Sequence, residues 1–296
     1  MSNLPPPPPS PLAPKPLDPR VGVALRLAFY ILIGFTGFVL IPALLLALVG
    51  PIVASTVGLF TVGIITNFLT LRIFDRLSLA AIGLGTAPGS GRNFVLGILF
   101  GGGSAALMLV APLLAGTGHF ERRPDGIFHW SSLLFYLVVL LFGAAGEEIL
   151  FRGYAFQLLW EKIGPWATIL PVAVLFGLGH LSNPNATSLG ILNTALWGAL
   201  LGYAFLRSHD LWLLIGLHYG WNAVLPLFGV NLSGLTIEIT RYYYKWDLGP
   251  LWSGGAYGPE GCLLTTIFVG MLFYLLVRAP VVQARSLLAP SLNVPD

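Results

Sequence analysis

Residues 146–153 read Gly-Glu-Glu-Ile-Leu-Phe-Arg-Gly, and this stretch decides how the chain folds, because it places two adjacent acids, Glu147 and Glu148, inside a long apolar run. The preceding residues 133–145 contain no charged side chain. An ionised carboxylate near the centre of a bilayer costs about 2.5–3.5 kcal/mol on insertion scales. Two such groups in a membrane helix therefore indicate a functional site.

The composition predicts a membrane protein. Hydrophobic residues make up 56% of the chain and charged residues 9%, whereas about 25% of the residues in a soluble domain are charged. The net charge of +3 does not indicate nucleic-acid binding, because the basic residues fall in predicted loops, where they orient the chain in the membrane. A single cysteine, Cys262, excludes an internal disulfide and is interpreted as a packing residue.

The hydropathy pattern predicts an all-α fold, a polytopic membrane bundle of about eight transmembrane helices. The predicted spans are 24–48, 52–74, 94–116, 131–157, 166–181, 189–206, 211–228 and 263–279. They form one transmembrane domain, residues 21–285. Residues 1–20 are rich in proline and lack the apolar core of a signal peptide, so they are predicted to be a disordered cytoplasmic tail, and residues 286–296 a C-terminal tail.

The basic residues predict that both termini are cytoplasmic. With the N-terminus inside, eleven Lys and Arg residues fall in inside segments and four in outside segments, which obeys the positive-inside rule. The four outside residues are Arg122, Arg123, Arg241 and Lys245. The absence of disulfides and of a targeting signal favours a bacterial cytoplasmic membrane.

Small and polar residues within the spans predict close contacts between helices. Gly97-xxx-Gly101 and Gly198-xxx-Gly202 have the spacing that lets two membrane helices approach closely. Asn67 and Asn193 lie in predicted spans and are expected to form interhelical hydrogen bonds.

Three polar patterns lie in apolar segments, and they are Glu147-Glu148-xxx-Arg152, Phe176-xxx-His180 and His218-xxx-Asn222. Helical residues four positions apart share one face. Glu148 is therefore expected to pair with Arg152, and His218 and Asn222 are expected to point to one spot. This pairing would neutralise Glu148 and leave Glu147 available for a reaction.

These groups suit the attack of activated water on a carbonyl carbon. Glu147 would accept the proton of the water, which His180 would help to position, while His218 and Asn222 would stabilise the oxyanion. A zinc ion bound by Glu147, His180 and His218 is the alternative, since two histidines and a glutamate are a known catalytic zinc set. The sequence has no His-Glu-xx-His motif, so the residues alone do not decide whether the site binds a metal ion.

Each residue also has a structural interpretation. Glu148 and Arg152 alone would form an ion pair, and single histidines in apolar helices are usually packing residues. Placing these polar groups in a membrane costs free energy, and this cost is offset only if the groups contact one another. Their joint presence therefore favours a shared site. The alternative function is a non-enzymatic membrane protein, either a proton-coupled transporter or a scaffold or bacteriocin-immunity factor, because buried Glu and His also relay protons.

The three patterns, in this order, resemble the motifs of the CAAX protease and bacteriocin-processing family of intramembrane endopeptidases, over about residues 131–228. The resemblance implies a membrane protease domain in which Glu147 is the general base and the residues His180, His218 and Asn222 surround the water and the oxyanion. Glu148, Arg152 and Phe176 then have supporting roles. It further implies a peptide or protein substrate with a lipidated or membrane-embedded C-terminal segment, contact with membrane lipids and no nucleic acid. The family includes assignments with and without a metal, so it leaves the cofactor open, and the oligomeric state cannot be read from the sequence.

The predicted topology contains one geometric conflict. Glu147 and His218 fall toward the cytoplasmic half, whereas His180 falls near the outer end of the short fifth span. A tilted span, a re-entrant segment or a different boundary of that span would each bring His180 inward.

Overall fold

In the computed structural model, apolar helices make up most of the described residues, which are 18–124, 128–284 and 288. The two predicted tails lie almost entirely outside these residues. The main helices are α1 (Pro19–Val49), α2 (Pro51–Thr70), α3 (Ser90–Leu114), α4 (Trp130–Arg152), α5 (Tyr154–Ile163), α6 (Pro165–Leu178), α7 (Ser188–Ser208), α8 (Leu211–Leu227) and α10 (Leu263–Arg278). A π-helical turn (Leu71–Asp75) continues α2, and α9 (Pro250–Ser253) is a single turn.

This architecture confirms the all-α class and a multi-pass integral membrane protein. Within the described residues, 5 helical segments are long and apolar enough to cross a membrane. The remaining candidates, α6, α8 and α10, have only 14, 17 and 16 residues. The predicted number of eight spans is therefore not confirmed, although a helix is present at every predicted position.

The predicted fourth span, residues 131–157, lies within one apolar segment, Trp130–Ile163, that is long enough to cross a membrane, but the helix in this segment is broken. The helix stops at Arg152, and α5 starts in a new direction after Gly153. At Gly153 the backbone has φ −74° and ψ −136°, and this ψ lies outside the helical region.

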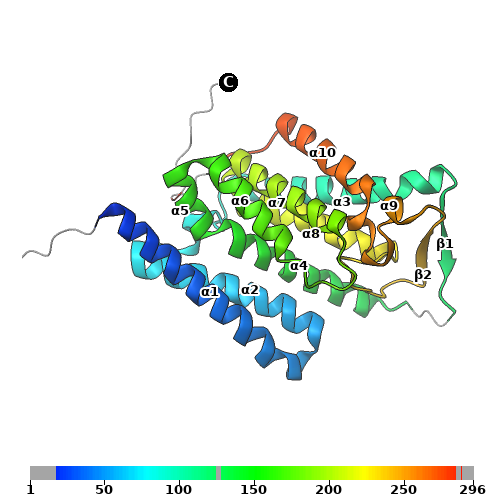
Figure 1. Cartoon of the computed structure of the whole chain (residues 1–296), viewed down its shortest axis with the longest axis horizontal. Helices are drawn as coiled ribbons and strands as arrows, with labels where there is room; N and C mark the ends of the chain where they lie inside the picture. The colour runs from blue at the N-terminus through cyan, green and yellow to red at the C-terminus, as the bar shows by residue number, and fades with distance from the viewer. Residues whose placement is uncertain (1–17, 125–127, 285–287, 289–296) are drawn as a thin grey trace, which may run out of the picture.

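The helices run roughly along one direction, with α5 at one end and the strands at the other (Figure 1). The hairpin of α1 and α2 lies along one side and contacts α4 through α2. The closest neighbours elsewhere are α3 with α8 and α6 with α7, and α4 also contacts α8. Helices α4 and α8, which carry most of the predicted site residues, thus meet in the interior.

Glycines allow α3 to lie directly against α8. A methyl group added at Gly97 would lie 2.4 Å from the carbonyl oxygen of Leu213. At Gly101 it would lie 2.0 Å from the carbonyl oxygen of Leu217. The close contact predicted from the Gly97-xxx-Gly101 spacing is confirmed, and it fixes the helix that carries His218.

The second glycine pair acts in the same way between α7 and α6. A methyl group at Gly198 would lie 2.9 Å from Cα of Ala173, and one at Gly202 would lie 2.9 Å from Cγ2 of Ile169. The close contact predicted for this pair is therefore also confirmed. It brings the end of α6 next to the middle of α7.

Two short strands, β1 (Gly118–Arg122) and β2 (Tyr242–Trp246), form an antiparallel pair in segments that the sequence predicted as loops. Glu121 accepts hydrogen bonds from Lys245, at 2.7 Å, and from the Tyr243 hydroxyl. The bond from Lys245 is the main cause that lowers the pKa of Glu121 to about 2.

The Gly101→Ala substitution is expected to destabilise the protein by about 1–3 kcal/mol, because the new methyl group collides with the backbone of α8. Heating the purified protein in detergent and measuring the fraction that stays folded would test this. Gly103→Ala is the matched control on the same helix, since a methyl group there meets nothing within 4 Å. Equal heat resistance of the two variants would contradict the prediction.

Candidate active site

Residues from three helices meet at the predicted site. Glu147, Glu148 and Arg152 lie in the last two turns of α4. His218 lies in the middle of α8, with Asn222 one turn later. Phe176 lies in the last turn of α6 and His180 just beyond it.

A fully buried carboxylate, that of Glu148, is the centre of this arrangement, with 0% of its side chain exposed. Its Oε1 accepts a hydrogen bond from Nδ1 of His218 at 2.8 Å, and its Oε2 lies 3.2 Å from Nη1 of Arg152. Glu148 and Arg152 thus form the ion pair that their spacing predicts. The same carboxylate also fixes the ring of His218.

Arg152 links the ion pair to two further helices. Its Nη2 donates to the carbonyl oxygen of Gly198 on α7 at 3.0 Å. Its guanidinium lies over the ring of Phe176 on α6, 4.4 Å from the centroid, a cation–π contact. The sequence analysis singled out Gly198 for helix packing and not for this bond, because a backbone carbonyl is the same at every residue.

Glu147 has a different environment from its neighbour. About a quarter of its side chain, 23%, is exposed. Its Oε2 lies 3.9 Å from Nε2 of His218, which is too long for a hydrogen bond. Within the part of the chain that the structure describes, this oxygen has no hydrogen-bond partner. Oε2 of Glu148 also has no hydrogen-bond partner there, but it lies in the ion pair with Arg152, so Glu147 is the more accessible of the two acids.

His180 lies next to Phe176, which in turn lies near the ring of His218. Its Nδ1 donates to the carbonyl oxygen of Phe176 at 2.8 Å, and its ring centroid is 5.1 Å from that of Phe176. The Phe176 ring is in turn 6.1 Å from the ring of His218. With 14 residues, α6 is about 21 Å long, which is shorter than a hydrocarbon core of about 30 Å.

Asn222 differs from Glu148, Arg152 and His218 in its hydrogen bonding. It is half-buried, and among the described residues no hydrogen bond of its side chain is present. The structure thus places Asn222 one turn from His218 without joining it to the Glu148 network.

The residues proposed as zinc ligands do not form a metal site in this arrangement. Both imidazoles donate from Nδ1 and leave Nε2 available, as metal-binding histidines do. Over residues 18–124 and 128–284, however, no three His, Cys, Asp or Glu side chains are grouped so that they could hold a metal ion. Glu147, His180 and His218 are thus not grouped as a metal-ligand set in the described structure, and the reaction proposed for them is written without a metal.

The two asparagines predicted to join helices both do so. Nδ2 of Asn67 donates to the carbonyl oxygen of Ile149 on α4 at 2.9 Å. Nδ2 of Asn193 donates to the carbonyl oxygen of Cys262, before α10, at 2.8 Å. The sequence analysis gave Asn67 no part in the site, although it binds the helix turn that carries the two acids.

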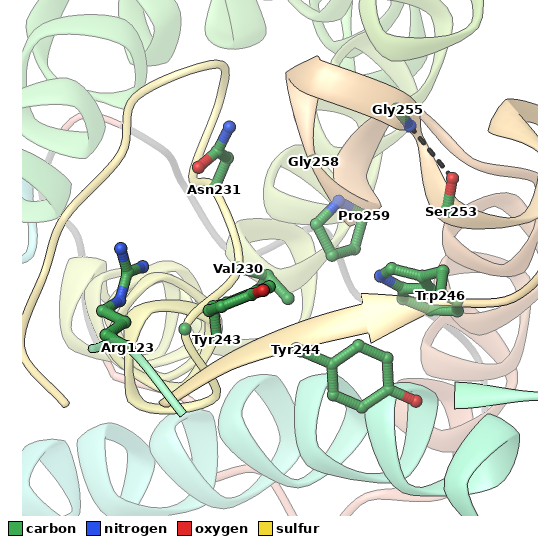
Figure 2. Close-up of a pocket in the computed structure, with 11 residues that line it drawn as sticks. Arg123, Val230, Asn231, Tyr243, Tyr244, Trp246, Ser253, Gly255, Gly258 and Pro259 are labelled. Atoms are coloured by element: carbon green, nitrogen blue, oxygen red, sulfur yellow. Dashed lines mark hydrogen bonds between the residues drawn. The ribbon is translucent and has the colours of Figure 1, made fainter. Parts of the chain in front are cut away.

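A cavity of about 360 Å³ lies away from the site, at the end of the molecule formed by the strands. Figure 2 shows its lining residues, which come from β2, the residue after β1, the segment after α8 and the residues around α9, with Ser253 bonded to the amide of Gly255. The guanidinium of Arg123 lies 5.6 Å from the ring centroid of Tyr243. None of the predicted site residues lines this cavity, so it is distinct from the candidate active site.

The fold and the site together define a class, a multi-pass membrane helical protein with a buried acid–imidazole centre. A family model described as "Rce1-like: Type II CAAX prenyl endopeptidase Rce1-like" matches residues 128–224. All three motifs lie within this segment, about a third of the chain, so the resemblance read from the motifs is confirmed, and the family is one of peptidases. No curated protein matches the chain.

The Arg152→Ala substitution is expected to destabilise the protein by about 3–5 kcal/mol, because it leaves the buried Glu148 carboxylate without its cation. Lys162→Ala is the control, since it breaks an exposed pair with Glu161 and should cost less than about 1 kcal/mol. The fraction of each variant that stays folded on heating would measure the difference. A wild-type value for Arg152→Ala would show that the ion pair does not hold the site.

Proposed function

We propose that this protein is an intramembrane endopeptidase in which Glu147 activates water for attack on a peptide bond. The observation that carries the proposal is the unequal environment of two adjacent acids. Glu148 is fully buried and bound by Arg152 and His218, whereas the side chain of Glu147 is 23% exposed and its Oε2 lies 3.9 Å from Nε2 of His218. The family match to a peptidase supports the same reaction class.

Glu147 is proposed as the general base. A positioned carboxylate that accepts the proton of a water molecule contributes about 10²–10⁴-fold to the rate. The water lies between Glu147 and His180, whose Nδ1 proton is held by the carbonyl oxygen of Phe176. The neutral ring of His180 then has a lone pair on Nε2, which accepts a hydrogen bond from the water.

His218 and Asn222 are proposed to stabilise the oxyanion. Because Nδ1 of His218 donates to Glu148, Nε2 is the atom that faces the substrate. For Nε2 to donate as well, the ring carries both protons, so His218 acts as an imidazolium. The side-chain amide of Asn222 supplies a second donor.

The reaction balances with these groups alone. The oxygen of the water bonds to the peptide carbonyl carbon as Glu147 takes the proton, and the carbonyl oxygen becomes the oxyanion. The carbon–nitrogen bond then breaks, and Glu147 gives the proton to the leaving amine. The products are a carboxylic acid, which retains the second proton of the water, and an amine.

The location of Glu147 in a membrane helix favours a substrate that reaches the bilayer. A peptide or protein with a membrane-embedded or lipidated C-terminal segment has this property. We place both termini on the cytoplasmic side on the basis of the Lys and Arg distribution.

The Glu147→Gln substitution is expected to reduce peptide cleavage by about 10²–10⁴-fold, since the amide cannot accept the proton. The measurement is cleavage of a reporter peptide by the purified protein in liposomes. Glu161→Gln, at an exposed acid outside the site, is the control and should cleave normally. Undiminished cleavage by Glu147→Gln would eliminate the mechanism, and proton flux without cleavage would favour a transporter.

Asn222→Ala is expected to lower kcat by about 10²–10³-fold, the usual effect of removing one oxyanion donor. Its resistance to heat should stay at the wild-type value, because the amide makes no hydrogen bond in the described structure. Kinetics and thermal unfolding on the same preparation would test both. Loss of stability together with activity would instead assign Asn222 a structural role.

A further inference from the structure

We infer that Asn67 on α2 is a positioning residue for the proposed reaction. It fixes the end of α4, the helix that carries Glu147, Glu148 and Arg152. The inference rests on the proposed function for its chemical consequence. Its structural part rests on a set of hydrogen bonds around the break between α4 and α5.

One side chain joins the two sides of that break. The last carbonyls of a helix lack the amides of a following turn, and partners from elsewhere can satisfy them. Nδ2 of Asn67 donates to the carbonyl oxygen of Ile149 at 2.9 Å. Oδ1 of Asn67 accepts from the backbone amide of Tyr154, the first residue of α5, at 2.7 Å. Only a side chain with both a donor and an acceptor can make these two contacts.

Asn67 is itself held in place. Its side chain is fully buried, and Nδ2 also lies 2.8 Å from the carbonyl oxygen of Gly63 and 3.1 Å from the hydroxyl of Tyr30. That hydroxyl donates to the carbonyl oxygen of Leu150 at 2.7 Å. Tyr30 therefore caps the next carbonyl of α4 and supports Asn67 at the same time.

Gly153 makes this close approach possible. A methyl group added at Gly153 would lie 2.2 Å from Oδ1 of Asn67 and 2.3 Å from the carbonyl oxygen of Ile149. Neither atom has room to move, because both belong to the same hydrogen-bonded set. The last glycine of the quoted stretch thus forms a matched pair with Asn67.

The break between α4 and α5 lies directly beside the residues of the candidate active site. Arg152 precedes Gly153 and binds Glu148, which in turn orients His218. A shift at the end of α4 therefore moves the acids relative to α8. A displacement of about 1 Å in such a constellation costs about 10²-fold in rate.

A second anchor on the same hairpin supports α5. The hydroxyl of Tyr154 donates to Oδ2 of Asp75 at 2.7 Å, and Oδ1 of Asp75 accepts from Nη1 of Arg26 at 2.7 Å. Residues of α1, α2 and the π-helical turn thus hold both the amide and the side chain of Tyr154.

The experiment compares Asn67→Ala with Asn193→Ala. Asn193 is the matched control, because it is an equally buried asparagine that joins α7 to α10 and to the residues before it, and none of its hydrogen bonds in the described structure goes to α4. Asn67→Ala should lower kcat by about 10²-fold with KM changed little, and hydrogen exchange of the Tyr154 amide should become faster. Asn193→Ala should lower heat resistance but keep kcat per folded molecule.

Tyr30→Phe is the second variant in case Asn67→Ala fails to fold. It removes only the hydroxyl, and it should change kcat and Tyr154 exchange in the same direction by a smaller amount. Wild-type kcat in folded Asn67→Ala, or in Tyr30→Phe if only that variant folds, would overturn the inference. An equal loss of kcat in Asn193→Ala would also overturn it, because the effect would then be general.

These outcomes are separable from failure of the proposed function. If Glu147→Gln cleaves normally, the mechanism fails whatever Asn67 does. If Glu147→Gln is inactive while Asn67→Ala cleaves at the wild-type rate, only the inference about Asn67 fails.

Discussion

The buried carboxylate of Glu148 is the constraint on which the rest of the structure depends. A charge with no solvent exposure is stable only when it is paired and hydrogen-bonded. Arg152 supplies the positive charge from the same helix and His218 a hydrogen bond from α8. Arg152 in turn needs acceptors of its own and takes the carbonyl of Gly198 on α7. One buried acid therefore requires three helices to hold a fixed relative position.

Glycines provide the close helix contacts that this position needs. A methyl group at Gly146, directly before the two acids, would lie 2.6 Å from the backbone nitrogen of Phe60 on α2. On α8, one at Gly216 would lie 2.2 Å from the carbonyl oxygen of Phe94 on α3. The two helices that meet at Glu148 are thus each supported from behind by a neighbour in backbone contact. Small residues allow this packing in a membrane, where apolar surface alone does not drive helices together.

The sequence predicted the parts of this design that act over a few residues. Spacing by four gave the pair of Glu148 with Arg152, and hydropathy located the helices. It did not predict the break at Gly153, since a glycine alone is tolerated within an apolar helix. The deciding partner, Asn67, lies 87 positions from Tyr154 in the chain. The pairing of β1 with β2 was missed for the same reason, because each strand is short and its partner is remote.

Helix α6 ends early and is followed by non-helical backbone near the candidate site, where the proposed reaction requires water. Non-helical backbone within a bilayer is tolerated only where protein buries it or where it lines a water-filled cavity. After α6 the chain continues in hydrogen-bonded turns, in which the amide of His180 donates to the carbonyl oxygen of Gly177 and that of Asn183 to the carbonyl oxygen of His180. His180 itself remains partly exposed. Because α6 ends at Leu178, His180 lies in these turns and not in a helix, with its ring against Phe176, the residue over which the guanidinium of Arg152 lies.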